Sequence, residues 1–96
     1  MTRDDVLQTL REHRDEWRRL GVKSLGLFGS AARDEAGVAS DVDVLVEFEG
    51  PATFDGYMAV KELLGHLLGR RVDLVTRKAL KPRLKDRIER EAIYVS

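Results

Sequence analysis

The segment between residues 25 and 46 constrains the fold of this chain more than any other part of the sequence. It contains Gly29 and Ser30, then ten residues, then a pair of aspartates at Asp41 and Asp43. The apolar residues before Gly29 predict a short buried strand, and the alternation of valine with acidic residues from Asp41 onward predicts a second strand. Side chains two residues apart on a strand share a face, about 6.6–6.8 Å apart. Both aspartates are therefore expected to project together beside the Gly-Ser turn.

Two carboxylates held side by side repel each other unless positive charge lies between them, and a divalent cation is the natural candidate. A third acid, Asp73, interrupts the apolar strand expected over residues 70–76. A buried carboxylate without a partner is costly, so Asp73 requires a cation nearby. It is either a third metal ligand or general base, or the partner of Arg70 or Arg71 in a salt bridge. The aspartate pair elsewhere in the chain favours the catalytic interpretation.

The residues that follow the first strand are candidates for holding phosphate. Gly29 has no Cβ, so the backbone there can approach phosphates closely. Ser30 begins a short helical turn expected over 30–34, where its hydroxyl and the backbone amides offer donors, and Arg33 lies one turn further on. Without a bound phosphate, Gly29 and Ser30 would form an ordinary strand-to-helix turn, and Arg33 would be a surface arginine. The chain has neither a P-loop nor a Rossmann glycine fingerprint.

The Gly-Ser and Asp-x-Asp spacing resembles the signature of the polymerase-beta-like nucleotidyltransferase superfamily. The short chain resembles in particular its minimal nucleotidyltransferases, the small partners of HEPN-domain proteins in bacterial and archaeal toxin–antitoxin pairs. The resemblance covers nearly the whole chain, and Asp34 departs from it because many relatives carry glycine there. The matching residues are Gly29-Ser30, Arg33, Ser40-Asp41-Val42-Asp43, Asp73, Leu80-Lys81-Pro82 and Glu91-Ala92-Ile93.

The resemblance implies a Mg²⁺-dependent enzyme that uses ATP, releases pyrophosphate and attaches AMP to a protein hydroxyl. The implied acceptor is a tyrosine of a cognate HEPN ribonuclease toxin, which the modification silences, so that the enzyme acts as the antitoxin. Asp41, Asp43 and Asp73 are then the catalytic and metal-binding residues. Two metal ions about 3.5–4 Å apart can clamp the attacking and leaving oxygens of such a reaction. The phosphate-binding candidates named above would hold the nucleotide.

Two other functions stay open at this point. The chain could be a non-catalytic antitoxin that neutralises its toxin by binding alone, although a pure binding module has no need for clustered acids. It could also transfer nucleotides to a small molecule of the aminoglycoside type. The chain lacks the extra domains that larger relatives use to hold DNA, tRNA or an antibiotic. This favours a substrate that brings its own surface, and we do not expect direct binding to nucleic acid.

Length and composition set further bounds. A chain of 96 residues is expected to form one domain, spanning residues 1–96, and its 43% hydrophobic and 35% charged residues are typical of a soluble globular protein. It has no cysteine, which excludes disulfides and suits the reducing cytoplasm, where we expect the protein. No apolar run reaches the roughly 18 residues of a membrane span, and no signal peptide is visible, so no membrane association is expected.

Charge is unevenly distributed although the formal net charge is zero. Residues 34–62 contain eight acids and one base, whereas residues 63–96 contain nine bases and four acids. The acidic middle suits metal binding. The basic end could face nucleotide phosphates, an acidic partner protein or RNA, but a solvated helix face accounts for most of these bases.

Hydrophobic periodicity and turn residues predict an α/β or α+β layer, and the resemblance implies a polymerase-beta-like fold with a small mixed sheet covered by helices. The first helix should carry Leu20 and a core Trp17, and the long middle helix should begin at an N-cap, Thr53, with Phe54 in its apolar stripe. The expected helices are 2–20, 30–34, 53–68 and 82–90, and the expected strands are 22–28, 41–48 and 70–76. Residues 92–95 are expected to form a terminal strand or an extended tail, and residues 35–40 a loop.

Overall fold

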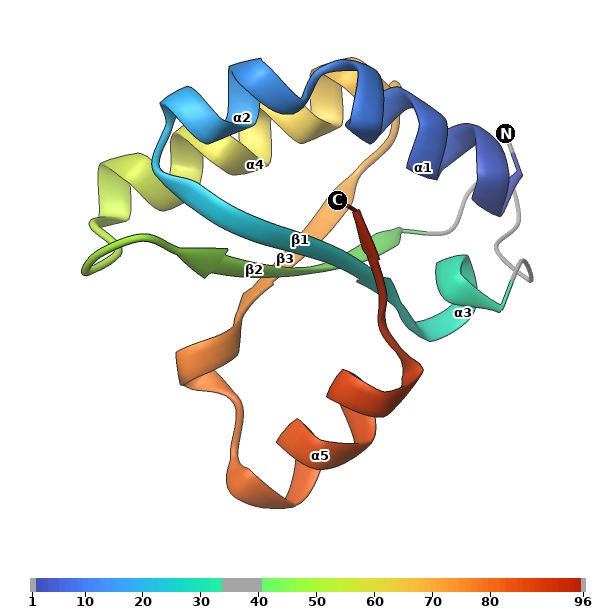
Figure 1. Ribbon diagram of the computed structural model, residues 1–96, viewed down its shortest axis with the longest axis vertical. Helices are drawn as coiled ribbons and strands as arrows, with labels where there is room; N and C mark the ends of the chain where they lie inside the picture. Colours follow the sequence, from blue (N-terminus) through green and yellow to red (C-terminus); the bar gives the residue numbers. More distant parts are fainter. Residues whose placement is uncertain (1, 34–40, 96) are drawn as a thin grey trace.

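The computed structural model describes residues 2–33 and 41–95 (Figure 1). The order of helices and strands agrees with the expected order, except that the first helix is divided in two and a short 3-10 helix, η1, follows the third strand. The loop expected over 35–40 and the end of the expected helical turn at Asp34 lie outside the described residues. The elements are α1 (Arg3–Glu12), α2 (Arg14–Arg19), β1 (Val22–Phe28), α3 (Gly29–Ala32), β2 (Val42–Phe48), α4 (Phe54–Leu68), β3 (Val72–Thr76), η1 (Arg77–Ala79), α5 (Pro82–Glu91) and β4 (Ile93–Val95).

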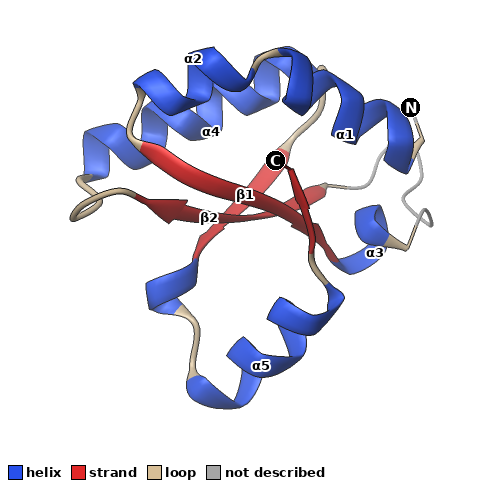
Figure 2. Cartoon of the chain, viewed as in Figure 1, coloured by secondary structure: helices blue, strands red, loops and turns tan. Residues whose placement is uncertain are grey.

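The four strands form one mixed sheet in the order β3-β2-β1-β4, which confirms the expected fold class. β1 is antiparallel to both β2 and β4, whereas β2 and β3 are parallel. Parallel neighbours need a crossover connection, and α4 supplies it. Helices α1, α2 and α4 lie on one side of the sheet and α5 lies on the other (Figures 1 and 2). One face of the sheet is therefore covered by three helices and the other by α5.

The main hydrophobic core lies between the sheet and the layer of α1, α2 and α4. Trp17 is completely buried, as expected, and its indole nitrogen donates a hydrogen bond of 2.9 Å to the Leu10 carbonyl. The other fully buried large side chains of this core are Leu10, Leu25, Leu27, Val42, Val44, Val46, Val60 and Leu64.

Two expected core residues are exposed instead. Leu20 is 37% exposed because it caps the end of α2, where the chain turns toward the sheet. Phe54 is 76% exposed because it is the first residue of α4, and only the later turns of that helix bury residues, with Val60, Leu64 and Leu68 in the core. Helical periodicity identified the apolar face but not how far along each helix the core extends.

The single helix expected over 2–20 is divided at His13 into α1 and α2. In a continuous helix the Leu10 carbonyl would accept from the backbone amide four residues later. Here the indole of Trp17 donates to that carbonyl, so the break allows the tryptophan to reach the core while the buried carbonyl keeps a hydrogen bond.

The helix ends follow the expected signals. Thr2 and Asp5 form a reciprocal capping box at the start of α1, and the Thr53 hydroxyl accepts from the Gly56 amide at the start of α4. Gly69 ends α4 in a left-handed conformation, and Pro82 is the first residue of α5. No helix within the described residues has the length and apolar character needed to cross a membrane.

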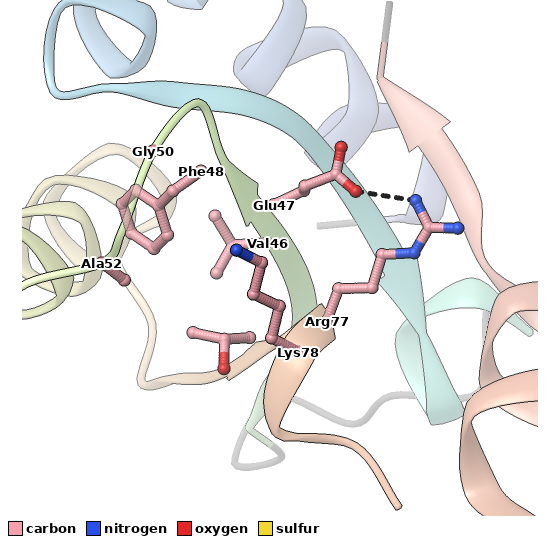
Figure 3. Close-up of a pocket in the computed structure, with 8 residues that line it drawn as sticks. Val46, Glu47, Phe48, Gly50, Ala52, Arg77 and Lys78 are labelled. Carbon is pink, nitrogen blue, oxygen red and sulfur yellow. Dashed lines mark hydrogen bonds and ion pairs between the residues drawn. The ribbon is translucent and has the colours of Figure 1, made fainter. Parts of the chain in front are cut away.

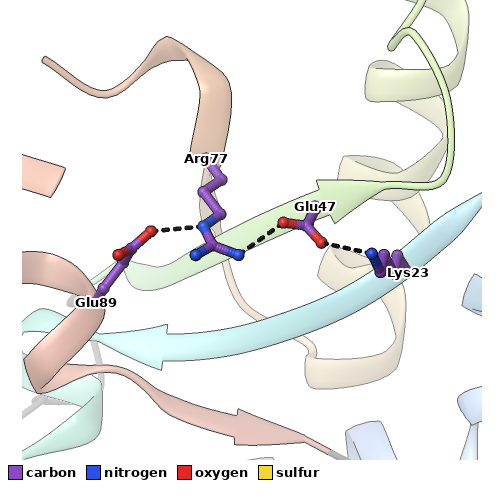
Figure 4. A network of polar contacts seen from close by, with 4 residues as sticks. All are labelled: Lys23, Glu47, Arg77 and Glu89. Carbon is purple, nitrogen blue, oxygen red and sulfur yellow. Dashed lines mark hydrogen bonds and ion pairs between the residues drawn. The ribbon is translucent and has the colours of Figure 1, made fainter. Parts of the chain in front are cut away.

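A network of charged side chains fastens α5 to the sheet (Figure 4). Arg77, which follows β3, donates to Glu89 of α5 and, at 2.7 Å, to Glu47 of β2. Lys23 of β1 lies 3.5 Å from the same Glu47 carboxylate. The hydrogen bond from Arg77 holds the pKa of Glu47 below its usual value. These contacts hold α5 beside the sheet face opposite the main core.

Candidate active site

Two of the three singled-out aspartates are cross-strand neighbours. Asp43 of β2 and Asp73 of β3 are register partners in the parallel pair. Strands in a sheet lie about 4.8 Å apart, and register partners project to the same face. Asp43 is half-buried and Asp73 is exposed on the edge strand, so the expectation that Asp73 is buried was wrong. Asp73 needs no cation to offset burial, and its carboxylate is open to solvent and to an incoming group.

The pKa of the Asp43 carboxyl lies above its ordinary value. Burial is the largest cause, and the negative charges of Asp73 and Asp41 and a side-chain hydrogen bond with Asp73 add to it. Asp41 itself is exposed, immediately before β2 begins. Negative charge is thus concentrated around Asp43, with Asp73 beside it and Asp41 close enough to act on it electrostatically.

Gly29 lies directly against the Asp43 carboxylate. Phe28, the last residue of β1, is the register partner of Asp43, so the chain leaves β1 next to the aspartate. Gly29 has a φ of +64°, and a Cβ built there would overlap Oδ2 of Asp43, well inside the 3.0 Å that real Cβ atoms keep from their neighbours. Glycine is therefore required twice here, for the left-handed backbone and for the space that the carboxylate occupies.

Ser30 and Arg33 follow in and after α3, at the same end of the sheet. Ser30 is half-buried within the four-residue helix, and the Arg33 amide donates to the Gly29 carbonyl at 3.3 Å. The Arg33 guanidinium is 4.0 Å from the Glu91 carboxylate at the end of α5, and its charge opposes the rise in the Asp43 pKa. Arg33 therefore lies near the end of α5 and within electrostatic reach of the acidic pair, Asp43 and Asp73, and of an anion bound there.

The acidic pair fits a divalent cation. Mg²⁺ prefers oxygen ligands and is often held by only one or two carboxylates together with substrate phosphates. The repulsion that raises the Asp43 pKa is the kind that such a cation relieves. Within residues 2–33 and 41–95, no three acidic, histidine or cysteine side chains cluster tightly enough to hold an ion by themselves. Any metal bound here would need further oxygen ligands, such as those of a nucleotide.

A small hollow lies at the opposite ends of β2 and β3, away from the aspartates (Figure 3). Its lining is mainly apolar, and its carboxylate, Glu47, is already engaged by Arg77. We therefore do not place nucleotide phosphates in it. The residues that line it are Val46, Glu47, Phe48, Gly50, Ala52, Thr76, Arg77 and Lys78.

The pairing of Arg77 with Glu47 and Glu89 was not predicted from the sequence. Arg77 was only one base among nine in the basic end of the chain, and its partners lie 30 and 12 residues away. The acidic residues of the second strand and the last helix, and the basic residues after the third strand, could have suggested an ion pair. They do not indicate which residues form it.

Comparison with known proteins gives consistent similarities. Residues 10–95 match the family described as nucleotidyltransferase domain. The protein adenylyltransferase MntA of Thermococcus cleftensis is 41% identical over 96 residues, which cover 99% of this chain and 97% of that protein. A solved structure described as a minimal nucleotidyltransferase is 43% identical, with a TM-score of 0.77, and the match covers 91% of this chain and 93% of the other.

A more distant structure shares the fold. It contains the tri-AMPylated HEPN toxin of Shewanella oneidensis in complex with its MNT antitoxin. The matched chain is 17% identical with a TM-score of 0.67, over 94% of this chain and 71% of that one.

Proposed function

This chain belongs to the nucleotidyltransferase domain family, and from that membership we propose that it transfers AMP from ATP to a hydroxyl group of a partner protein. The acceptor we propose is a tyrosine of a HEPN-domain toxin, so that the chain acts as an antitoxin in the cytoplasm. The observation that carries the proposal is the pairing of Asp43 with Asp73 against Gly29. Relatives described as protein adenylyltransferases support the choice of AMP and of a protein acceptor.

Each residue of the site has a distinct part in the proposed reaction. Gly29 lets the Asp43 carboxylate lie directly against the turn after β1, Ser30 donates a hydrogen bond to the triphosphate, and Arg33 offsets its charge. Mg²⁺, when bound by the aspartates and the phosphates, would neutralise charge on the triphosphate. The orientation of the nucleotide by these groups converts an encounter between two molecules into a reaction within one complex.

The transfer forms a bond between the acceptor oxygen and the α-phosphorus of ATP. The bond between that phosphorus and the oxygen leading to the β-phosphate breaks, and pyrophosphate leaves. The proton of the acceptor hydroxyl passes to Asp73, whose exposed position on the edge strand makes it accessible to a side chain from another protein. Asp41, exposed immediately before β2, would add a further carboxylate near the metal.

Two competing functions make different predictions. A non-catalytic antitoxin would bind its toxin without using nucleotide, and a small-molecule nucleotidyltransferase would modify an acceptor such as an aminoglycoside in the absence of the toxin. Incubation with radiolabelled ATP, Mg²⁺ and either the HEPN protein or a panel of small hydroxylated acceptors separates the three. We expect label only on the protein.

The binding of ATP should depend on a divalent cation. The acidic pair repels the triphosphate unless positive charge lies between them, so we expect calorimetry to show clear ATP binding with Mg²⁺ and much weaker binding in EDTA. Equal affinity under both conditions would contradict a site built on Asp43 and Asp73.

The hydroxyl of Ser30 should contribute to the use of nucleotide. A hydrogen bond to a charged group contributes roughly 1.5–3 kcal/mol, so Ser30→Ala should reduce kcat/KM for ATP about tenfold or more. Ser24→Ala is the matched control, because Ser24 is also half-buried but pairs with Glu47 at the far end of the site face. Equal values of kcat/KM in the two variants would show that the Ser30 hydroxyl takes no part in binding the nucleotide and that Ser30 is only a turn residue.

A further inference from the structure

The sheet face that carries Asp43 also carries an exposed aromatic ring. β4 is antiparallel to β1, with Tyr94 the register partner of Gly26. The Tyr94 ring lies over this glycine, and a Cβ built on Gly26 would be 3.1 Å and 3.2 Å from Cδ1 and Cε1 of the ring. The tyrosine nevertheless remains 43% exposed. The missing side chain at position 26 thus lets the ring lie close to the sheet while part of it faces solvent.

Register places Tyr94 on the same face as the acidic pair. Gly26 and Phe28 are two residues apart on β1 and share a face, and Phe28 is the partner of Asp43. Tyr94 shares the face of its partner Gly26, so it shares the face of Asp43 as well. Strand spacing and rise put their backbones roughly 12 Å apart, with β1 between them. A nucleotide with its phosphates at Asp43 would reach this ring by extending its ribose and base across β1, beside α5, which lies on the same side of the sheet.

We propose that Tyr94 is the stacking platform for the nucleobase of the bound nucleotide. The proposal rests on the function proposed above, because it takes the phosphates to lie at Gly29 and Asp43. An aromatic ring can also cover a strand glycine purely for stability, as in the aromatic rescue of glycines in sheets. The other tyrosine, Tyr57, is different, since it is half-buried and its hydroxyl donates to the Leu74 carbonyl. Tyr57 therefore serves as an internal control.

Two variants separate stacking from packing. Tyr94→Phe keeps the aromatic face, whereas Tyr94→Leu covers Gly26 with an apolar side chain that cannot stack. Calorimetry in the presence of Mg²⁺ should compare ATP with inorganic tripolyphosphate, which has no base. We expect Tyr94→Leu to weaken ATP binding about fivefold or more, the range of base–aromatic stacking, and to leave tripolyphosphate binding unchanged. Tyr94→Phe should bind both as the parent does.

The unaltered protein provides a measurement that does not depend on a variant folding. In NMR spectra the ring protons of Tyr94 should shift on addition of ATP with Mg²⁺ and not on addition of tripolyphosphate, while those of Tyr57 stay in place. Tyr94 resonances that do not shift, or an equal loss of affinity for ATP and tripolyphosphate in Tyr94→Leu, would show that Tyr94 does not stack on the base. Either result would leave the proposed function intact. If the parent protein binds neither ATP nor tripolyphosphate, the proposed function fails together with the platform.

Discussion

Replacing Asp43 with asparagine is expected to reduce nucleotide transfer at least about 100-fold, because groups that stabilise charge at a phosphoryl centre contribute several kcal/mol. Asparagine keeps the shape of the side chain but removes the charge beside Asp73. The variant should remain folded and should still bind its partner, because the substitution keeps the size of a single half-buried side chain. A pull-down of the toxin, a thermal melt and a transfer assay with labelled ATP measure these three properties separately.

The same substitution should stabilise the metal-free protein at neutral pH. The raised pKa of Asp43 means that the folded chain binds a proton more tightly there than the unfolded chain does. The contribution of Asp43 to stability should therefore fall as the pH rises from about 3.9, the ordinary value for aspartate, through the raised pKa of this group, which lowers the melting temperature of the parent relative to that of Asp43→Asn. Asparagine does not titrate, so Asp43→Asn should lack this fall. Melting temperatures measured in EDTA across this pH range test the sign directly.

The binding-only antitoxin predicts a different result for Asp43→Asn. Cells carrying the variant would then resist the toxin as well as cells with the parent do, because catalysis would be dispensable. An unfolded variant would instead be identified by its melt, and the loss of transfer would carry no information about mechanism.

Replacing Gly29 with alanine should reduce transfer to a similar extent while leaving every charged group in place. The new Cβ would overlap Oδ2 of Asp43, so either the carboxylate or the backbone must move. A displacement of about 1 Å at a reacting centre can cost about 100-fold in rate. Alanine in the left-handed region adds backbone strain of roughly 1–2 kcal/mol.

Gly69→Ala is the matched control for this strain. Gly69 has a φ of +62°, close to the +64° of Gly29, but a Cβ there meets nothing within 4 Å. The melting temperatures of both variants should fall because of the strain, by about 4–8 °C for each kcal/mol of destabilisation in a domain of this size. Only Gly29→Ala should also lose transfer activity. Equal activity in the two alanine variants would show that close approach of Gly29 to Asp43 has no part in the reaction.

The sequence contains enough information to predict the neighbourhood of the site. Two short patterns, a glycine after an apolar strand and an alternating Asp-x-Asp, placed Gly29 and the aspartates at the ends of strands. The period of two on β2 predicted a shared face for Asp41 and Asp43, and the register adds Asp73 as the cross-strand partner of Asp43. The strands and the turn could be predicted because they rest on local geometry, which neighbouring residues determine, whereas the pairing of Asp43 with Asp73 depends on how β2 and β3 align.

The contacts that depend on tertiary register could not be predicted in the same way. The overlap of a Gly29 Cβ with Asp43 follows from the pairing of Phe28 with Asp43, and no local pattern specifies that pairing. The position of Tyr94 over Gly26 depends on the return of the chain as an edge strand. The exposure of Phe54 likewise depends on where α4 extends past the sheet rather than on its apolar periodicity.

The proposed transfer of AMP to a partner protein is tested most directly by the intact mass of a HEPN-domain protein that forms a complex with this chain. After incubation with the parent chain, ATP and Mg²⁺, that protein should gain the mass of one or more AMP groups, located on tyrosine by fragmentation, and should gain none with Asp43→Asn. An unchanged mass with the parent chain, in a mixture where the two proteins form a complex, would contradict the account.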